Sequence, residues 1–199
     1  MKIAVVDSGI HAGHPHVGAV AGGIDFTGDD WSDRLGHGTA AAGAVREKAP
    51  GAELYAVKIF DRRLSTTIGT IVRALAWCAE HQMDLVNLSL GTTNAEHREA
   101  FERAVLGLTV VSAAGALPGV LDGVIAVAAD LDCPRDAFHY RNGVFYASPY
   151  PRPIRGVPPE RNLHGSSFAV ANMTGFTAQL LETVAPAELR AALIRRARA

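Results

Sequence analysis

The sequence predicts an α/β protein, with a mainly parallel central sheet in three layers and helices on both faces. Short apolar runs alternate with segments of helical spacing, which is typical of βαβ units. Most of these runs are rich in Val, Ile and Leu and lack a clean polar alternation, as expected for strands that helices cover on both faces. A chain of 199 residues fits a single domain over residues 1–199.

The elements of the first two thirds follow from this pattern. Strands are predicted at residues 2–6, 23–26, 53–59, 85–88, 109–113 and 124–128. Residues 66–81 place Ile68, Ile71, Leu75 and Cys78 at helical spacing, and residues 94–106 repeat this pattern. Asn94 is the predicted N-cap of the second helix.

The last third has a different character. Asn142-Gly143 separates two aromatic-rich runs, which predicts a hairpin turn. The dense prolines of residues 149–159 predict an extended surface loop without a helix. Residues 166–181 predict an apolar helix, and Pro186 opens a basic C-terminal helix. The segment 138–159 is interpreted as either a substrate lid or a dimer surface.

Composition and charge limit which partners the chain is expected to bind and in which cell compartment it is expected. The chain has 19 Lys and Arg, 20 Asp and Glu, and a net charge of -1, so it has no basic excess to neutralise nucleic-acid phosphates. The apolar run before Asp7 is too short for a signal peptide or a membrane helix. Cys78 and Cys133 are expected to be buried structural thiols. We therefore expect a cytoplasmic protein with no nucleic acid or membrane partner.

Three segments place a reactive side chain where a loop meets a regular element. Asp7 follows the first predicted strand, at the edge where parallel sheets place their ligands. His37 lies between Gly36 and Gly38, ahead of small residues that continue as a helix. Ser167 comes near the start of an apolar helix, where free N–H groups favour developing negative charge. Each feature alone is weak evidence, because capping or turn residues occur at the same places.

Together, Asp7, His37 and Ser167 follow the chain order of the subtilisin triad. Asp7-Ser8-Gly9, His37-Gly38-Thr39 and Gly165-Ser166-Ser167-Phe168-Ala169 resemble the three signature motifs of the subtilase family of serine peptidases. The runs Val86 to Gly91 and Val110 to Gly115 resemble the two walls of its substrate cleft. The resemblance covers nearly the whole chain.

This resemblance implies a subtilisin-like fold and cleavage of peptide bonds in a peptide or protein substrate. Ser167 is then the nucleophile, His37 the general base and Asp7 the residue that orients it, with no cofactor and no metal. The implied substrate-binding residues are Ser89, Leu90 and Gly91 on one wall and Ala113, Ala114 and Gly115 on the other.

The chain departs from the family at the oxyanion site. Ala116 stands where the family has an asparagine that donates to the oxyanion. Asn162, His164 or a residue from a partner subunit of a homo-oligomer are alternative donors. Ala40 replaces a second histidine, and Ala171-Asn172 replaces Pro-His after the nucleophile, which indicates altered packing.

Two clusters suggest metal sites, but in both a solvated loop is favoured. His11, His14 and His16 do not match a metal-binding template. The acidic residues around Trp31 do not match a calcium loop. These residues are Asp25, Asp29, Asp30 and Asp33.

Two functions remain open. The first is a restricted intracellular peptidase that processes peptides or precursors, for instance by trimming a leader from a ribosomally made peptide. The second is a catalytically weak or inactive pseudoprotease that binds peptides or acts as a scaffold. The kept triad residues favour the first, and Ala116 favours the second.

Overall fold

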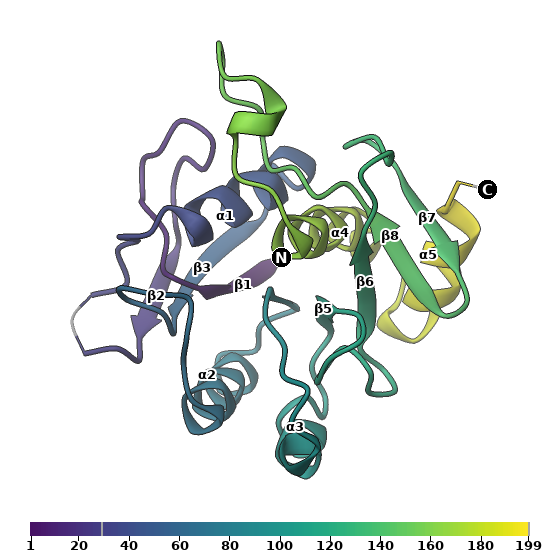
Figure 1. The fold of residues 1–199 in the computed structure, drawn as a ribbon. Coiled ribbons are helices and arrows are strands. Elements are labelled where there is room, and N and C mark those ends of the chain that lie inside the picture. The colour runs from purple at the N-terminus through teal and green to yellow at the C-terminus, as the bar shows by residue number, and fades with distance from the viewer. Residues whose placement is uncertain (29, 199) are drawn as a thin grey trace.

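The computed structural model describes residues 1–28 and 30–198, and its strands join in one sheet (Figure 1). Their order across the sheet is β2-β3-β1-β4-β5-β6-β8-β7. Neighbouring strands are parallel except for the antiparallel pair of β7 and β8. The bounds are β1 (Lys2–Asp7), β2 (Gly22–Asp25), β3 (Glu53–Lys58), β4 (Leu85–Leu88), β5 (Val110–Ala113), β6 (Ile125–Ala129), β7 (Phe138–Arg141) and β8 (Val144–Ala147).

Helices cover both faces of the sheet (Figure 1). One face carries α1 (His37–Lys48), α4 (Ser166–Leu181) and α5 (Leu189–Arg196), and the other carries α2 (Ile68–Glu80) and α3 (Arg98–Ala104). In β1, Ile3 and Val5 belong to the first core, whereas Ala4 and Val6 belong to the second. Because both faces are buried, the strand sequences do not alternate, which confirms the predicted α/β class.

The predicted elements agree with the structure to within a few residues, with three differences in detail. The segment after Asn94 begins as a 3-10 turn, Ala95–His97, before α3, and the Asn94 side chain accepts a hydrogen bond from Glu96 N (3.1 Å). Pro186 likewise opens a 3-10 turn before α5. The proline-rich loop, predicted to lack helix, contains the 3-10 turn Pro159–Arg161. Proline is tolerated at the start of such a turn because the first N–H groups need no intrahelical partner.

The hairpin is confirmed, and so is the burial of both thiols. Asn142 and Gly143 connect β7 and β8 with φ angles of 51° and 86°, the left-handed pair that a two-residue hairpin requires. Cys78 and Cys133 are free and buried. Burial raises the pKa of the Cys78 thiol to about 12. Within the described ranges, no helix combines the length and the apolarity needed to cross a bilayer.

A buried lysine joins the two helices that carry predicted catalytic residues at their starts. Gly175 of α4 lets α1 approach so closely that a Cβ there would lie 2.7 Å from the Cβ of Lys48. The Lys48 side chain is 6% exposed, and its Nζ donates to Asn172 Oδ1 (2.6 Å) and contacts Glu47 Oε2 (3.3 Å). The Asn172 amide donates in turn to two backbone carbonyls after β8, those of Ser148 and Tyr150 (both 2.9 Å). Lys48 and Asn172 therefore hold α1, α4 and the start of the proline-rich loop together.

This lysine gives a pH-dependent stability. Burial lowers the pKa of Lys48 to about 8, although Glu47 opposes the change. An unfolded lysine titrates near 10.4, so the unfolded state binds more protons between these values and stability rises with pH across that window. We expect the free energy of unfolding of wild type, relative to Lys48→Met, to rise by ~3 kcal/mol between pH 8 and 10.5.

Urea unfolding of both proteins at several pH values measures this difference. Other groups titrate in both proteins, so the comparison isolates the amine of Lys48. A difference that stays constant across the window would show that the amine is solvated in the folded protein.

Candidate active site

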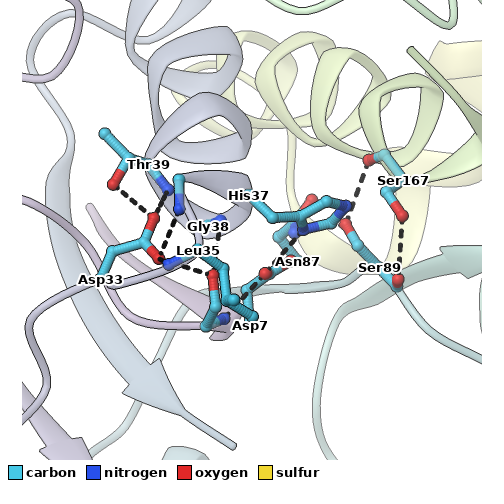
Figure 2. A network of polar contacts seen from close by, with 11 residues as sticks. Asp7, Asp33, Leu35, His37, Gly38, Thr39, Asn87, Ser89 and Ser167 are labelled. Carbon is cyan, nitrogen blue, oxygen red and sulfur yellow. Dashed lines mark hydrogen bonds and ion pairs between the residues drawn. The ribbon is translucent and has the colours of Figure 1, made fainter. Parts of the chain in front are cut away.

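The structure brings the three predicted catalytic residues together at the carboxyl edge of the sheet. Asp7 is the last residue of β1, His37 is the first of α1, and Ser167 is the second of α4. Figure 2 shows the His37 imidazole between Asp7 and Ser167. Residues that lie 30 and 130 positions apart in the chain thus share one site.

Asp7 and His37 form a buried pair. Asp7 is fully buried, and its Oδ1 accepts a hydrogen bond from Ser8 N and lies 2.7 Å from His37 Nδ1. The Phe168 ring packs against the imidazole with a centroid separation of 5.1 Å. Burial disfavours the imidazolium, but the hydrogen bond to Asp7 and the charges of Asp7 and Asp33 outweigh it and raise the pKa of His37. With Nδ1–H donating to Asp7, Nε2 is left as the acceptor.

Ser167 lies at an uncapped helix start. Gly165 takes the N-cap position with a φ of 146°, and no side chain caps α4. Ser167 Oγ donates to the Ser89 carbonyl (3.2 Å), and Ser89 Oγ donates to the Ser167 carbonyl (3.1 Å) (Figure 2). Within residues 1–28 and 30–198, no hydrogen bond joins Ser167 Oγ to His37. The hydroxyl therefore has Ser89 as its partner in this state.

Asp33 connects the end of β1 to the start of α1. Its Oδ1 accepts hydrogen bonds from Ser8 Oγ, Leu35 N and Gly36 N (2.8 to 2.9 Å), and its Oδ2 accepts from the N and Oγ1 of Thr39 (2.8 and 2.6 Å). Ser8 Oγ also accepts from Gly38 N (2.9 Å). Sequence reasoning placed Asp33 only in an acidic loop. Its position four residues before His37 was the available signal.

A second network supports Ser89. The Asn87 amide donates to Ser89 Oγ (2.9 Å), and Thr174 Oγ1 of α4 donates to Asn87 Oδ1 (2.9 Å). Ser112 Oγ of β5 donates to the carbonyls of Leu88 and Leu90 (3.0 and 3.1 Å). The segment 89–91 is therefore fixed both to the helix of Ser167 and to the neighbouring strand.

Ala116 presents a methyl group and packs against Gly91, where an added Cβ would lie 2.8 Å from the Cβ of Ala116. The next residues of the two segments, Thr92 and Leu117, exchange two backbone hydrogen bonds (3.0 and 2.9 Å). Asn162, one alternative oxyanion donor, directs its amide to the Arg152 carbonyl (3.2 Å). That amide is therefore used inside the proline-rich loop.

In the described ranges, no group of three or more His, Cys, Asp or Glu side chains is placed to hold a metal ion. The rings of His11, His14 and His16 lie edge to face, with centroid separations of 6.3 and 5.2 Å. The acidic loop instead surrounds Lys58, whose buried Nζ donates to the carbonyls of Asp30 and Ser32 (3.0 and 3.1 Å). Asp29 lies outside the described residues.

Comparison with known proteins gives the family. The model of the subtilase family, peptidase S8, matches residues 1–136, which include Asp7 and His37 and end before Ser167. The chain belongs to the subtilase family. It is 34% identical over 151 residues to a thermostable alkaline protease of Halalkalibacterium halodurans, covering 64% of this chain and 41% of that protein. It is 29% identical over 214 residues to subtilisin DY of Bacillus licheniformis, covering 91% and 76%.

Further comparisons agree with this family and with its fold. Subtilisin E of Bacillus subtilis is 35% identical over 130 residues, covering 58% of this chain and 34% of that protein. Thus the chain spans less than half the length of two of these three relatives. The crystal structure of a lanthipeptide protease superposes with a TM-score of 0.69 at 20% identity, covering 96% of this chain and 74% of that one. The subtilisin-like fold predicted from the sequence is therefore confirmed.

Gly38 tests the contact between β1 and α1. A Cβ on this residue would lie 2.2 Å from the Gly9 carbonyl oxygen and 3.1 Å from the Cβ of Asp7. Gly38→Ala must therefore push the start of α1 away from β1, at a cost of ~1–3 kcal/mol in the free energy of unfolding. Urea unfolding measures this loss.

Gly69→Ala is the matched control. This glycine lies in the first turn of α2, and an added Cβ there would have its nearest neighbour at 3.9 Å. Alanine is the better helix former, so this variant should be as stable as wild type or gain ~0.5 kcal/mol. Equal stability of Gly38→Ala and wild type would contradict the tight contact.

Proposed function

We propose that this chain is a serine endopeptidase that cleaves peptide bonds through an acyl-enzyme, with Asp7, His37 and Ser167 as its triad. The observation that carries the proposal is the buried hydrogen bond of 2.7 Å between Asp7 and His37, beside a serine at an uncapped helix start. Membership of the subtilase family supports the same chemistry. The substrate is a peptide or protein.

Substrate binding releases the nucleophile in this mechanism. An extended peptide that pairs with the segment 89–91 offers a backbone N–H to the Ser89 carbonyl, the group that now accepts from Ser167 Oγ. The displaced hydroxyl then turns to His37 Nε2. The N and O of Gly91 make no hydrogen bond in the described part of the chain, so they are free to pair with the same peptide.

The chemical steps follow from these positions. His37 accepts the proton of Ser167 as Oγ attacks the carbonyl carbon, and then gives that proton to the leaving amine. Water attacks the acyl-enzyme with the same assistance and restores Ser167. Asp7 holds the imidazole in the required tautomer and stabilises the imidazolium. The Ser167 N–H at the start of α4 donates to the oxyanion.

Ala116 makes this a restrained enzyme, because its methyl group donates no hydrogen bond to the oxyanion. Loss of the corresponding asparagine lowers turnover by about 10²–10³ in a subtilisin. Such an activity suits an intracellular enzyme that processes a small set of peptides or precursors, a role and a location that stay predictions from the sequence. A pseudoprotease that binds peptides without turnover is the second candidate, and Ala116 favours it.

Labelling with a fluorophosphonate separates the two candidates. The folded wild-type chain should be labelled on Ser167, because the probe reacts only with an activated serine. Ser167→Ala should abolish labelling, whereas the control Ser166→Ala, which alters the exposed neighbouring residue, should retain it. A folded wild-type protein that is never labelled would overturn the enzyme and leave the pseudoprotease.

The same assay tests the oxyanion site. Ala116→Asn restores an amide at this position and should raise the labelling rate by ~10²-fold or more. A rate equal to that of wild type would show that another donor already serves the oxyanion.

The pH dependence of activity should reflect the raised pKa of His37. The base must be neutral, so kcat/KM should fall with decreasing pH through an apparent pKa above the ~6.5 of an ordinary histidine. Asp33→Asn removes one of the charges that raise this pKa, so the acid limb should move to lower pH. A limb at or below pH 6.5 in wild type would contradict this electrostatic environment.

A further inference from the structure

A cavity of about 250 Å³ lies next to the proposed active site and has no part in the mechanism above. Its walls come from the histidine loop (residues 11–16), the start of α1 and the proline-rich loop (residues 149–163). In Figure 1 the proline-rich loop projects beyond α1, near the loop that follows β1. The lining includes His11, His14, His16, Gly36, Arg152 and Leu163.

The lining of the cavity includes residues that neighbour the predicted catalytic residues in the chain. Gly36 immediately precedes His37, and Leu163 lies four residues before Ser167. The segments 89–91 and 113–115 supply none of its lining in the described structure. The cavity is therefore distinct from the predicted peptide-pairing segments, and a peptide that pairs with segment 89–91 leaves it open to residues beyond that pairing.

The lining is mostly apolar, and its hydrogen-bonding side chains include three imidazoles and the Arg152 guanidinium. Burial and the neighbouring charge of Arg152 lower the pKa of His16, so its imidazole favours the neutral form. Three imidazoles line one wall, and Arg152 reaches the same wall by donating its Nη1 to the His16 carbonyl (3.1 Å). Glu47 Oε1 lies 4.0 Å from Arg152 Nε, but Glu47 makes shorter contacts to Lys48 and Arg135. The Glu47 carboxylate thus contacts three cationic side chains, so it neutralises the charge of Arg152 only in part.

Asp33 is the one carboxylate among the described residues of the lining, and it does not offset these donors. Asp33 accepts five hydrogen bonds from the protein, all within the loop and helix start described above. Its oxygens are therefore committed to holding α1. The mouth of the cavity is apolar, with Ile154 and Leu163 both nearly half exposed, at 47% and 46%.

We propose that this cavity binds an aspartate or glutamate side chain of the substrate, in one of the first two residues after the cleaved bond. The methylene groups of that side chain would pack on Ile154 and Leu163, and its carboxylate would accept hydrogen bonds from Arg152 and the imidazoles. The inference rests on the function proposed above, and it names the substrate class: peptides with an acidic residue on the leaving-group side.

A cleavage-site survey tests the preference without a known substrate. Wild-type protein is incubated with a peptide library from a proteome digest, and the cleaved bonds are read by mass spectrometry. A hydrogen bond to a charged group contributes ~1.5–3 kcal/mol, so peptides with Asp or Glu at the relevant position should be cleaved about 10-fold faster than their Asn or Gln counterparts.

Arg152→Met should abolish this preference, because it keeps an unbranched apolar stem and removes the charge and the hydrogen-bond donors. The matched control is Arg155→Met, which removes an exposed arginine of the same loop that does not line the cavity and should keep the preference. Thermal unfolding of both variants confirms that they are folded. Equal cleavage of acidic and amide peptides by wild type would overturn the inference while the peptidase stands.

A binding measurement tests the same preference for acidic peptides without requiring cleavage. Ser167→Ala protein is titrated with fluorescent peptides that differ only in Glu or Gln at the tested position, and the Glu peptide should bind about 10-fold more tightly. If the chain binds but never cleaves, this result keeps the inference and rejects the enzyme. Equal affinities, or one-to-one binding of Zn²⁺ that His14→Asn abolishes, would instead overturn the acidic site.

Discussion

The hydrogen bond between Asp7 and His37 is the constraint around which the site is built. It requires a carboxylate at the end of a buried strand and an imidazole at the start of a helix on one face of the sheet. Asp33 meets this requirement by accepting from both segments, and Gly38 meets it by leaving room for the backbone of β1. The charges of Asp7 and Asp33 in turn raise the pKa of His37. The carboxylates of Asp7 and Asp33 therefore both hold His37 in place and raise the pKa of its imidazole.

The packing of α1 on α4 transmits this constraint to Ser167, the proposed nucleophile. Each helix carries a reactive side chain at its start, and Lys48 and Asn172 lock the two helices together at a distance from the site. A buried ammonium is costly, which its lowered pKa expresses. Its hydrogen bonds offset part of that cost and select one alignment of the two helices. The family's Pro-His pair is thus replaced by an asparagine with a defined structural task.

In the proposed function, restraint of the enzyme has two physical sources. The Ser167 hydroxyl has the Ser89 carbonyl as its partner when no peptide is bound, and Ala116 offers no donor to the oxyanion. A peptide that pairs with segment 89–91 relieves the first restraint. The second would remain, so turnover by the proposed enzyme would depend on substrates that bind well elsewhere. The cavity beside Arg152 is proposed above as one place where such binding energy arises.

The sequence by itself determined the α/β class, most element bounds and the three motif positions, because these depend on local periodicity and on residue types at strand and helix ends. It also indicated the loss of the oxyanion donor at Ala116. Only the tertiary structure decided what the remaining polar residues do. Asp33 and Asp30 lie in one acidic segment, yet the Asp33 carboxylate accepts hydrogen bonds at the start of α1, whereas the Asp30 carbonyl accepts one from Lys58 of β3. Such roles depend on contacts between segments far apart in sequence, which no local pattern records.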